Sequence, residues 1–443
     1  MTTSDNISSC ISEHEAQALS VGAAQAILRR WAQPVTTVER LALRSCLDRV
    51  LAEDVVSPID VPAHDNAAMD GYAFAGAVLA ETTAGTQGPG DATQLALDVA
   101  GRALAGHPFT GALAARQCVR IMTGAPMPAG CDTVVPQELV TRSGERIVFD
   151  ARGLERGANR RRAGEDLARG CLALHAGRIM RASDIGLLAS LGIAEVAVRR
   201  RLRVAFFSTG DELRSIGEPL DTGCVYDSNR YTLWAMLTRL NVEVLDLGVV
   251  RDDPAALVTA FRSAAQCADA VLSSGGVSVG EADFTRRTLE TLGDVAFWQL
   301  AMRPGRPFAF GRVWPDGQQG RERDERAALY FGLPGNPVAV MATFYQIVRG
   351  ALLSMSGADA PAPLQLAASA TAPIKKRPGR TEYLRGIASR EHDGSWRVTP
   401  TRSQSSGVLS SMSEANCFII LAHQQGDIVA GDSVDIMPFE GLI

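Results

Sequence analysis

The sequence predicts an α/β multidomain protein with a three-layer α/β/α domain, a β-rich inserted module, a helical linker domain and a C-terminal β-barrel. Three observations predict this class. Apolar strands and helical stretches alternate regularly from residue 202 to 355, prolines, glycines and short apolar alternations dominate residues 58–150, and short alternating strands return after residue 361. At ~150 residues per domain, 443 residues fit several domains. The expected bounds are 1–57 plus 151–201 for the linker, 58–150, 202–355 and 356–443.

The alternation between residues 202 and 355 predicts a parallel sheet covered by helices on both faces. Strands are expected at 204–207, 242–247, 270–272, 295–300 and 329–331. Helices are expected at 229–240, 254–267, 284–292 and 337–353. A polar insert at 315–327 interrupts what would be a hairpin, and we expect it to form a solvent-exposed loop.

The flanking regions carry weaker patterns. Apolar positions at helical spacing predict a helix over 16–32, which Pro34 stops, and a second helix over 183–191 with Ser183 as its cap. Alternating residues predict strands near 118–122 in the module, and near 417–421 and 433–437 in the tail.

Composition excludes several classes of function. A net charge of −5 argues against a general nucleic-acid binder, and no apolar run approaches the ~20 residues that span a bilayer. The polar N-terminus does not resemble a signal peptide, so a cytoplasmic location is expected. The eight cysteines form no C-x-x-C pair, which argues against zinc or iron–sulfur ligation.

A glycine-rich run, 273–283, follows an expected strand and precedes an expected helix. Such a turn points several backbone N–H groups at one place, and the helix N-terminus adds positive charge, so phosphate is the natural ligand. The expected phosphate-binding residues are Ser274, Gly275, Gly276, Ser278 and Gly280. Asp283, near the helix start, could hold a hard cation beside the phosphate.

Four loops follow expected strands, at 208–212, 251–253, 273–283 and 332–337. In open α/β sheets ligands bind beyond the carboxyl ends of the strands, so we expect these loops to share one pocket. They contribute Thr209, Gly210, Asp211, Glu212, Asp252, Asp283, Gly335 and Asn336. Each loop alone is typical of a turn or a helix cap. Their joint occurrence predicts Mg²⁺, held by Glu212, Asp252 and Asp283 next to a phosphate.

Basic and polar loops complete the candidate site. Arg303 and Arg306 flank a Pro-Gly turn that suits an oxyanion, and a second cationic cluster spans 375–380 in the tail. Lys375 and Lys376 are the only lysines among 44 basic residues, so the chain uses arginine almost everywhere. The module adds three dense polar loops at 65–72, 123–126 and 160–166.

These motifs resemble those of the molybdopterin molybdotransferases, the family that includes bacterial MoeA and the C-terminal domain of gephyrin. The matching stretches are D-N-A-A-M-D-G-Y, M-T-G-A-P-M-P, R-R-R-A-G-E-D, S-T-G-D-E-L, Y-D-S-N, S-S-G-G-V-S-V-G-E-A-D, R-P-G-R-P and L-P-G-N-P, in the family's order over nearly the whole chain. The resemblance implies Mg²⁺-dependent insertion of molybdate into adenylylated molybdopterin with release of AMP, by an elongated homodimer of four-domain subunits.

The resemblance also implies residue roles. Asp70, Thr123 and Asp166 would come from the second subunit, and Arg303, Arg306, Arg380 and Ser406 would face the oxyanion and pterin. Three positions depart from the family pattern. Arg303 stands where lysine is usual, Gln299 where some relatives carry lysine, and Ala339 where serine is frequent.

Two other functions stay open from the sequence. The fold also serves as a receptor scaffold in gephyrin, although the full set of carboxylates here favours an enzyme. A relative that shares only the α/β domain adenylylates molybdopterin, and the additional modules here favour the insertion step. The nearly isosteric oxyanions molybdate and tungstate are not distinguished. Transient contact with other proteins of the same biosynthesis is expected.

Overall fold

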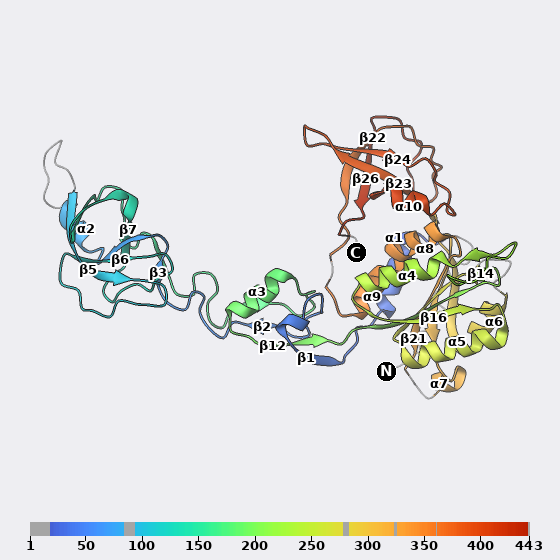
Figure 1. Cartoon of the computed structure of the whole chain (residues 1–443). Helices are drawn as coiled ribbons and strands as arrows, with labels where there is room; N and C mark the ends of the chain where they lie inside the picture. Colours follow the sequence, from blue (N-terminus) through green and yellow to red (C-terminus); the bar gives the residue numbers. More distant parts are fainter. Residues whose placement is uncertain (1–17, 84–93, 278–282, 323–325, 360, 442–443) are drawn as a thin grey trace.

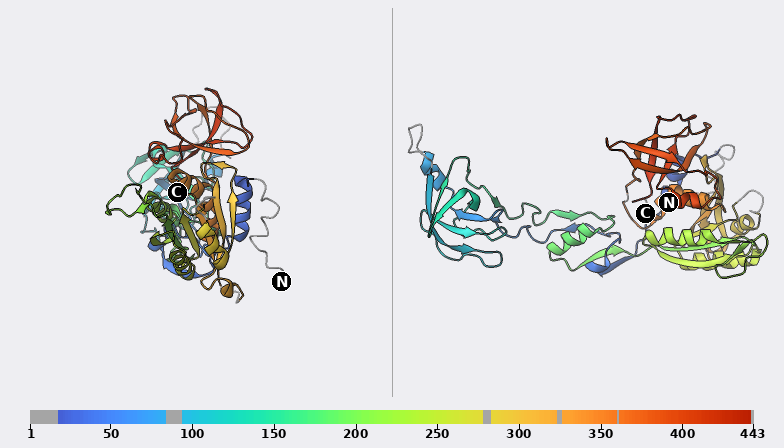
Figure 2. Two further views of the ribbon diagram at one scale, coloured as in Figure 1. Left: turned by 90° about the vertical axis from the view of Figure 1, so that its right-hand side faces the viewer. Right: turned by 45° about the horizontal axis from the view of Figure 1, so that its top comes forward.

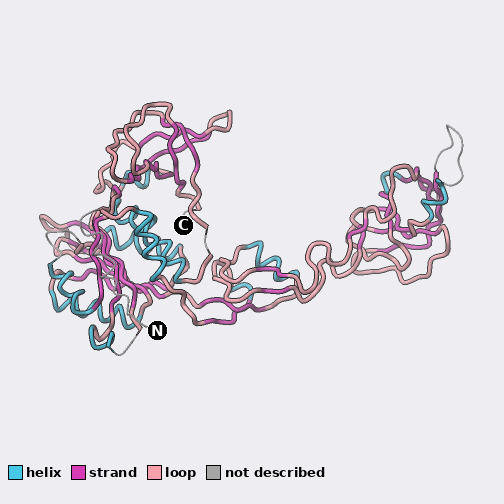
Figure 3. The backbone as a smooth tube through the Cα atoms, turned by 180° about the vertical axis from the view of Figure 1, so that it is seen from behind, coloured by secondary structure: helices cyan, strands magenta, loops and turns pink. Residues whose placement is uncertain are grey.

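The computed structural model describes residues 18–83, 94–277, 283–322, 326–359 and 361–441. The chain is elongated (Figure 1). The α/β domain and the C-terminal barrel lie together at one end, the β-rich module lies at the other, and a small unit around helix α3 connects them. The other views show the same separation (Figures 2 and 3).

A six-stranded sheet forms the centre of the α/β domain, in the order β16-β13-β17-β21-β20-β18. Its parallel strands are β16 (Glu243–Val250), β13 (Arg203–Thr209), β17 (Ala270–Ser274) and β21 (Ala328–Leu333). Of the other two strands, β20 (Pro307–Val313) runs antiparallel to both its neighbours, β21 and β18 (Gly293–Gln299), so β18 points the same way as the four parallel strands. The expectation of a parallel sheet is therefore wrong at β20, a strand that was not predicted. The reason is local: a turn, rather than a crossover helix, joins β18 to β20.

Helices cover both faces of this sheet, which confirms the three-layer prediction. One face packs against α5 (Pro254–Cys267) and α6 (Asp283–Leu292), with Phe261 fully buried against Phe207. The other face packs against α4 (Ser228–Arg239), α8 (Pro337–Thr343) and α9 (Arg349–Met355). Successive strand residues alternate between the two cores, as the pleat requires: Phe206 belongs to one and Phe207 to the other.

A single helical segment runs from Pro337 to Met355, with a π-helical turn, η4 (Phe344–Val348), between α8 and α9. Its length and mean hydropathy of 1.4 would suffice to cross a membrane, but 72% of the window is buried inside the structure. The segment packs as a core helix of the α/β domain.

The first helix, α1 (Val21–Trp31), packs against α9 and η4, and its Ala24 and Leu28 lie in the core of the α/β domain. The linker was expected to include residues 1–57, but this helix lies in the α/β core. The linker unit itself consists of short elements: β1 (Val38–Ala42), η2 (Leu43–Ser45), β2 (Val55–Val56), β11 (Leu172–Leu174), α3 (Ala182–Ser190) and β12 (Glu195–Arg199). The expected cap Ser183 is wrong: Arg181 is the N-cap of α3, so Ser183 lies inside the first turn, and the Asp184 carboxylate accepts the backbone N–H of Arg181 at 2.9 Å.

The inserted module is built on a six-stranded sheet in the order β7-β4-β6-β5-β9-β8. Its elements are β4 (Gly71–Phe74), α2 (Val78–Thr83), β5 (Gln94–Ala103), β6 (Gln117–Ile121), β7 (Thr133–Pro136), η3 (Gln137–Leu139), β8 (Val140–Ser143) and β9 (Arg146–Asp150). Beside it, β3 (Asn66–Ala67) pairs with β10 (Arg160–Arg161), which brings two of the polar loops together.

The tail forms a closed barrel, as predicted. The strands β22 (Leu366–Ala370), β23 (Thr381–Arg390), β24 (Trp396–Pro400), β25 (Cys417–Leu421) and β26 (Ser433–Pro438) close through the pairing of β23 with β25. A short strand of the α/β domain, β19 (Met302–Arg303), adds to β23 and docks the barrel. Helix α10 (Ser410–Glu414) precedes β25.

Three further short elements were not expected. The polar insert, predicted as a loop, contains helix α7 (Gln318–Glu322). The strands β14 (Leu213–Arg214) and β15 (Val225–Tyr226) form a small flap after β13.

Candidate functional site

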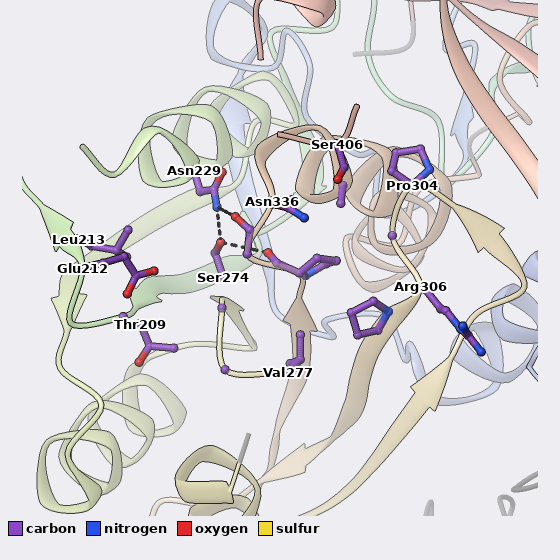
Figure 4. Close-up of a pocket in the computed structure, with 18 of the residues that line it drawn as sticks. Thr209, Glu212, Leu213, Asn229, Ser274, Val277, Pro304, Arg306, Asn336 and Ser406 are labelled. Carbon is purple, nitrogen blue, oxygen red and sulfur yellow. Dashed lines mark hydrogen bonds between the residues drawn. The ribbon is translucent and has the colours of Figure 1, made fainter. Parts of the chain in front are cut away.

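A pocket of about 720 Å³ opens at the carboxyl ends of β13, β17 and β21 (Figure 4). Segments from two domains line it. The α/β domain supplies the glycine turn after β17, the turn 303–307 and the start of α8, while the barrel supplies residues 404–406. The sheet topology places the strand ends side by side, so the expectation that strand-end loops converge is met for the described residues of these loops.

The glycine turn approaches its neighbours too closely for side chains. Gly275 has φ +92° and Gly276 has φ +68°, and a Cβ on Gly275 would lie 2.4 Å from the carbonyl oxygen of Thr209. A Cβ on Gly276 would lie 2.6 Å from the hydroxyl of Thr285 in α6. The turn therefore needs glycine at both positions. Ser278 and Gly280, also predicted to bind phosphate, lie outside the described residues.

Replacing Gly275 with alanine is expected to destabilise the protein by at least about 2 kcal/mol, because the new Cβ meets both the positive φ and the Thr209 carbonyl. The free energy of unfolding, measured with denaturant, checks this. Gly335→Ala is the matched control: Gly335 lines the same pocket, and a Cβ there would meet no atom within 4 Å. Equal stability of the two variants would contradict the steric argument.

A hydrogen-bond network holds the glycine turn against the loop that precedes α8. The Nδ2 group of Asn229 donates to the Ser274 hydroxyl at 2.8 Å and to the Gly335 carbonyl at 2.7 Å, and Ser274 donates to the Pro334 carbonyl at 3.4 Å (Figure 4). Asn229, in α4, ends the Y-D-S-N stretch, to which no role was assigned from the sequence, and the structure makes it a pocket residue. Asn336 lines the pocket at the N-cap of α8.

Two carboxylates line the pocket near the glycine turn. Asp252 accepts a hydrogen bond from the Thr209 hydroxyl, and its backbone N–H donates to Asp211 at 3.4 Å. The Glu212 carboxylate lies over Gly210, where a Cβ would approach it to 2.6 Å. Asp211 itself lines an adjoining hollow rather than this pocket.

The expected metal triad is only partly described. Asp283 begins α6, but its side chain lies outside the description, and the described residues contain no group of three metal-ligating side chains. Glu212 and Asp252 supply hard oxygen donors on one wall of the pocket, the donor type that Mg²⁺ prefers.

Two arginines line the opposite side of the pocket. Arg303 and Arg306 flank Gly305, which has φ +99°, and a Cβ there would lie 2.2 Å from the Thr343 hydroxyl. Figure 4 shows Arg306 and Pro304 across the pocket from Glu212. The turn is therefore pinned against α8, and both guanidinium groups start from a fixed backbone.

The barrel contributes differently from the expectation. Ser406 lines the pocket, and its carbonyl accepts the Val338 N–H at 3.0 Å. Arg380 is not among the lining residues; it pairs with Glu382 beside the pocket at 2.8 Å. Of the departures from the family pattern, Ala339 lines the pocket, whereas Gln299 is exposed at the end of β18 and outside the lining.

Arg385 is a further residue that sequence reasoning missed. Its side chain is fully buried in the barrel and donates to the carbonyls of Ser403 and Ser405 at 3.2 and 3.1 Å. Burial, together with the positive charge of nearby Arg303, lowers the pKa of this guanidinium to about 10. Arg385 thereby fixes the loop that lines the pocket. The only sequence signal is a charged residue that follows the apolar pair Tyr383-Leu384.

Asp70 and Thr123 of the inserted module form a cluster separate from the pocket. Both the backbone N–H and the hydroxyl of Thr123 donate to Asp70 Oδ1 at 2.7 Å, and these bonds lower the pKa of the Asp70 carboxyl. Asp166 is exposed, and its N–H bonds the Val61 carbonyl at 3.0 Å. The module lies at the opposite end of the elongated chain from the pocket (Figure 1). One chain therefore does not bring Asp70, Thr123 and Asp166 to the pocket.

Family models match most of the chain. They are the MoeA N-terminal region (domain I and II) over residues 19–192, a probable molybdopterin binding domain over 205–354, and the MoeA C-terminal region (domain IV) over 367–439. The chain is 41% identical to the molybdopterin molybdenumtransferase of Haemophilus influenzae, an alignment that covers 92% of this chain and 95% of that protein. It is 34% identical to molybdopterin molybdenumtransferase 1 of Mycobacterium tuberculosis, over 90% and 93% of the two chains.

A solved structure shares the whole architecture. The molybdopterin biosynthesis MoeA protein of Pyrococcus horikoshii matches with a TM-score of 0.77 at 27% identity, covering 96% of this chain and all of that one. Together with the domain order and the strand-end pocket, these matches show that the chain belongs to the MoeA family of molybdopterin molybdenumtransferases.

Proposed function

We propose that this protein inserts molybdate into adenylylated molybdopterin and releases AMP, as the final step of molybdenum cofactor biosynthesis, with Mg²⁺ required. The pocket carries the proposal, because it joins a glycine turn suited to phosphate, two carboxylates and two arginines in one space. The names of the curated relatives support the transferase class and the molybdopterin substrate.

The phosphoanhydride of the substrate would lie over the glycine turn at residues 274–276. The N–H of Gly275 donates to the Leu333 carbonyl at 3.2 Å, so the N–H of Gly276 would be the one to face a phosphate oxygen. Asp252 and Glu212, with Asp283 as the expected third carboxylate, would hold Mg²⁺. When bound, the ion neutralises charge on the phosphate oxygens. Thr209 keeps Asp252 in place through its hydroxyl, and Asn229 and Ser274 keep the glycine turn in register with the start of α8.

Molybdate is a dianion that must approach an anionic dithiolene, so it needs cations. Arg303 and Arg306 line the pocket, and Arg380 lies beside it; Ser406 offers a neutral hydroxyl. Electrostatic stabilisation of the developing charges would couple metal transfer to cleavage of the anhydride, and no side chain need act as a covalent nucleophile.

The working unit in this proposal is a homodimer. Asp70, Thr123 and Asp166 would reach the pocket of a second copy, because a single elongated chain holds them at its far end. Transient contact with other proteins of the same biosynthesis, in the cytoplasm, would deliver the substrate and remove the product.

The test is incubation of the purified protein with adenylylated molybdopterin, molybdate and Mg²⁺. The expected result is stoichiometric AMP release together with metal-loaded pterin, both dependent on Mg²⁺. Tight pterin binding without AMP release at any molybdate concentration would indicate a binding or scaffold role and contradict the proposal.

A further inference from the structure

Glu382 is a buried carboxylate at the junction of the barrel and the α/β domain. Its exposed fraction is 1%. The parallel pairing of β19 with β23 aligns Arg303 of the α/β domain with Glu382 of the barrel, and the N–H of Thr381 donates to the Ala301 carbonyl at 2.9 Å. Glu382 therefore lies directly behind the arginine-bearing turn of the pocket.

Each oxygen of this carboxylate faces a different arginine. Oε1 accepts from Nε of Arg380 at 2.8 Å, and Oε2 lies 3.8 Å from Nη1 of Arg303. The two arginine side chains are 41% and 52% exposed, whereas the Glu382 side chain is 2% exposed. A rigid buried group thus orients two long, partly exposed side chains, one from each domain.

Lys376 holds the barrel loop that carries Arg380. The Lys376 ammonium, 4% exposed, donates to the carbonyls of Arg380, Arg377 and Gln425 at 2.7, 3.0 and 3.3 Å. Burial lowers the pKa of Lys376, and the negative charge of Glu382 opposes that shift. Lys375, in contrast, is exposed and pairs with Asp427 at 2.8 Å. Of the two lysines, Lys376 alone belongs to this buried cluster.

We propose that Glu382 is a positioning residue for the oxyanion: it fixes the guanidinium groups of Arg303 and Arg380 in one arrangement at the edge of the pocket, so that a tetrahedral dianion meets preset donors from both domains. This inference rests on the proposed function, since it concerns how that site receives molybdate.

The sign of the effect separates positioning from simple charge balance. Removing the negative charge of Glu382 makes the region more positive, and charge alone would then strengthen the binding of a dianion. Losing the anchor instead frees two flexible side chains, which must be ordered again whenever the anion binds. Fixed, charge-assisted donors are worth more than mobile ones, so we expect the loss of positioning to dominate.

The decisive variant is Glu382→Gln, which keeps the side-chain size and removes the charge. We expect the KM for molybdate to rise about tenfold, the KM for adenylylated molybdopterin to stay within about twofold, and Glu382→Asp to show a smaller rise. Asp435→Asn is the matched control, because it removes one carboxylate from an exposed position on strand β26 of the same barrel. Its two KM values should equal those of the wild type.

A lower KM for molybdate in Glu382→Gln would show charge balance only, and equal rises in both KM values would show a merely structural role; either overturns the proposal. If Glu382→Gln does not fold, Glu382→Asp and Arg303→Gln decide, since their double variant should show much less than the product of the single effects. Equilibrium dialysis with molybdate alone tests the positioning role of Glu382 separately from the proposed transferase function. Wild-type binding that weakens in the Glu382 variants supports positioning even if no AMP is released, and unchanged binding overturns it.

Discussion

Replacing Asp252 with asparagine is expected to lower the rate of AMP release about 10²- to 10³-fold, the range seen when one preorganised electrostatic group is removed from a site. Asp252 lines the pocket and is held by the Thr209 hydroxyl. Asparagine can still accept that hydrogen bond, so the fold should persist while the charge that we propose attracts Mg²⁺ is lost. The measurement is AMP release as a function of Mg²⁺ concentration.

The neighbouring residue provides the matched control. Asp253 caps α5 by accepting the Ala256 N–H at 2.9 Å and is not among the residues that line the pocket. Asp253→Asn makes the same chemical change one position away, and asparagine is a comparable N-cap. It should keep both activity and stability. If Asp252→Asn keeps full activity at limiting Mg²⁺, or if both variants lose activity equally, Asp252 does not belong to the metal site.

The parts of the site that could be predicted from the sequence are those set by local rules. The glycine turn, the Asp252 loop and the start of α8 each follow a strand, and the carboxyl ends of parallel strands meet at one edge. Those rules need only the order of strands and helices along the chain. They fail at β20, which follows β18 without a crossover helix and is therefore antiparallel.

The residues that the sequence did not reveal depend on contacts between distant segments. Glu382 and Arg385 flank the apolar pair Tyr383-Leu384 in β23, a pattern that does not mark either charged residue as buried, and only the docking of β19 on β23 places them behind the pocket. Asn229 lies on α4, and its role follows from reaching both Ser274 and Gly335. Arg380 was placed in the pocket by resemblance, whereas in the structure its partner Glu382 holds it beside the pocket.

In the inserted module, too, the sequence indicated the candidate residues but not where they lie relative to the pocket. From the sequence, Asp70 and Thr123 are candidate functional residues on two polar loops. In the structure, two hydrogen bonds join them. It also separates them from the pocket by the length of the molecule (Figure 1). Two readings follow: the cluster only stabilises the module, or it completes the pocket of another subunit.

Mixing two inactive variants distinguishes these readings. Asp70→Ala removes the cluster in the module and Asp252→Ala removes a carboxylate of the pocket, and each homodimer should be inactive. In a mixed dimer with a shared cleft, one cleft combines the intact pocket of one subunit with the intact module of the other. An equimolar mixture with random exchange should therefore recover about a quarter of the wild-type rate of AMP release, since half of the dimers are mixed and each has one working cleft.

The matched control mixes Asp70→Ala with Thr123→Ala, whose defects both lie in the module. No cleft in that mixed dimer has an intact module, so no activity should return. Subunit exchange is verified in both mixtures with differently tagged chains. Recovery in the first mixture alone assigns Asp70 to the cleft of the second subunit, because a purely stabilising cluster would fail in its own chain whichever partner it has. Verified exchange without recovery would instead mean that each chain builds its site alone, and the elongated shape would then need another explanation.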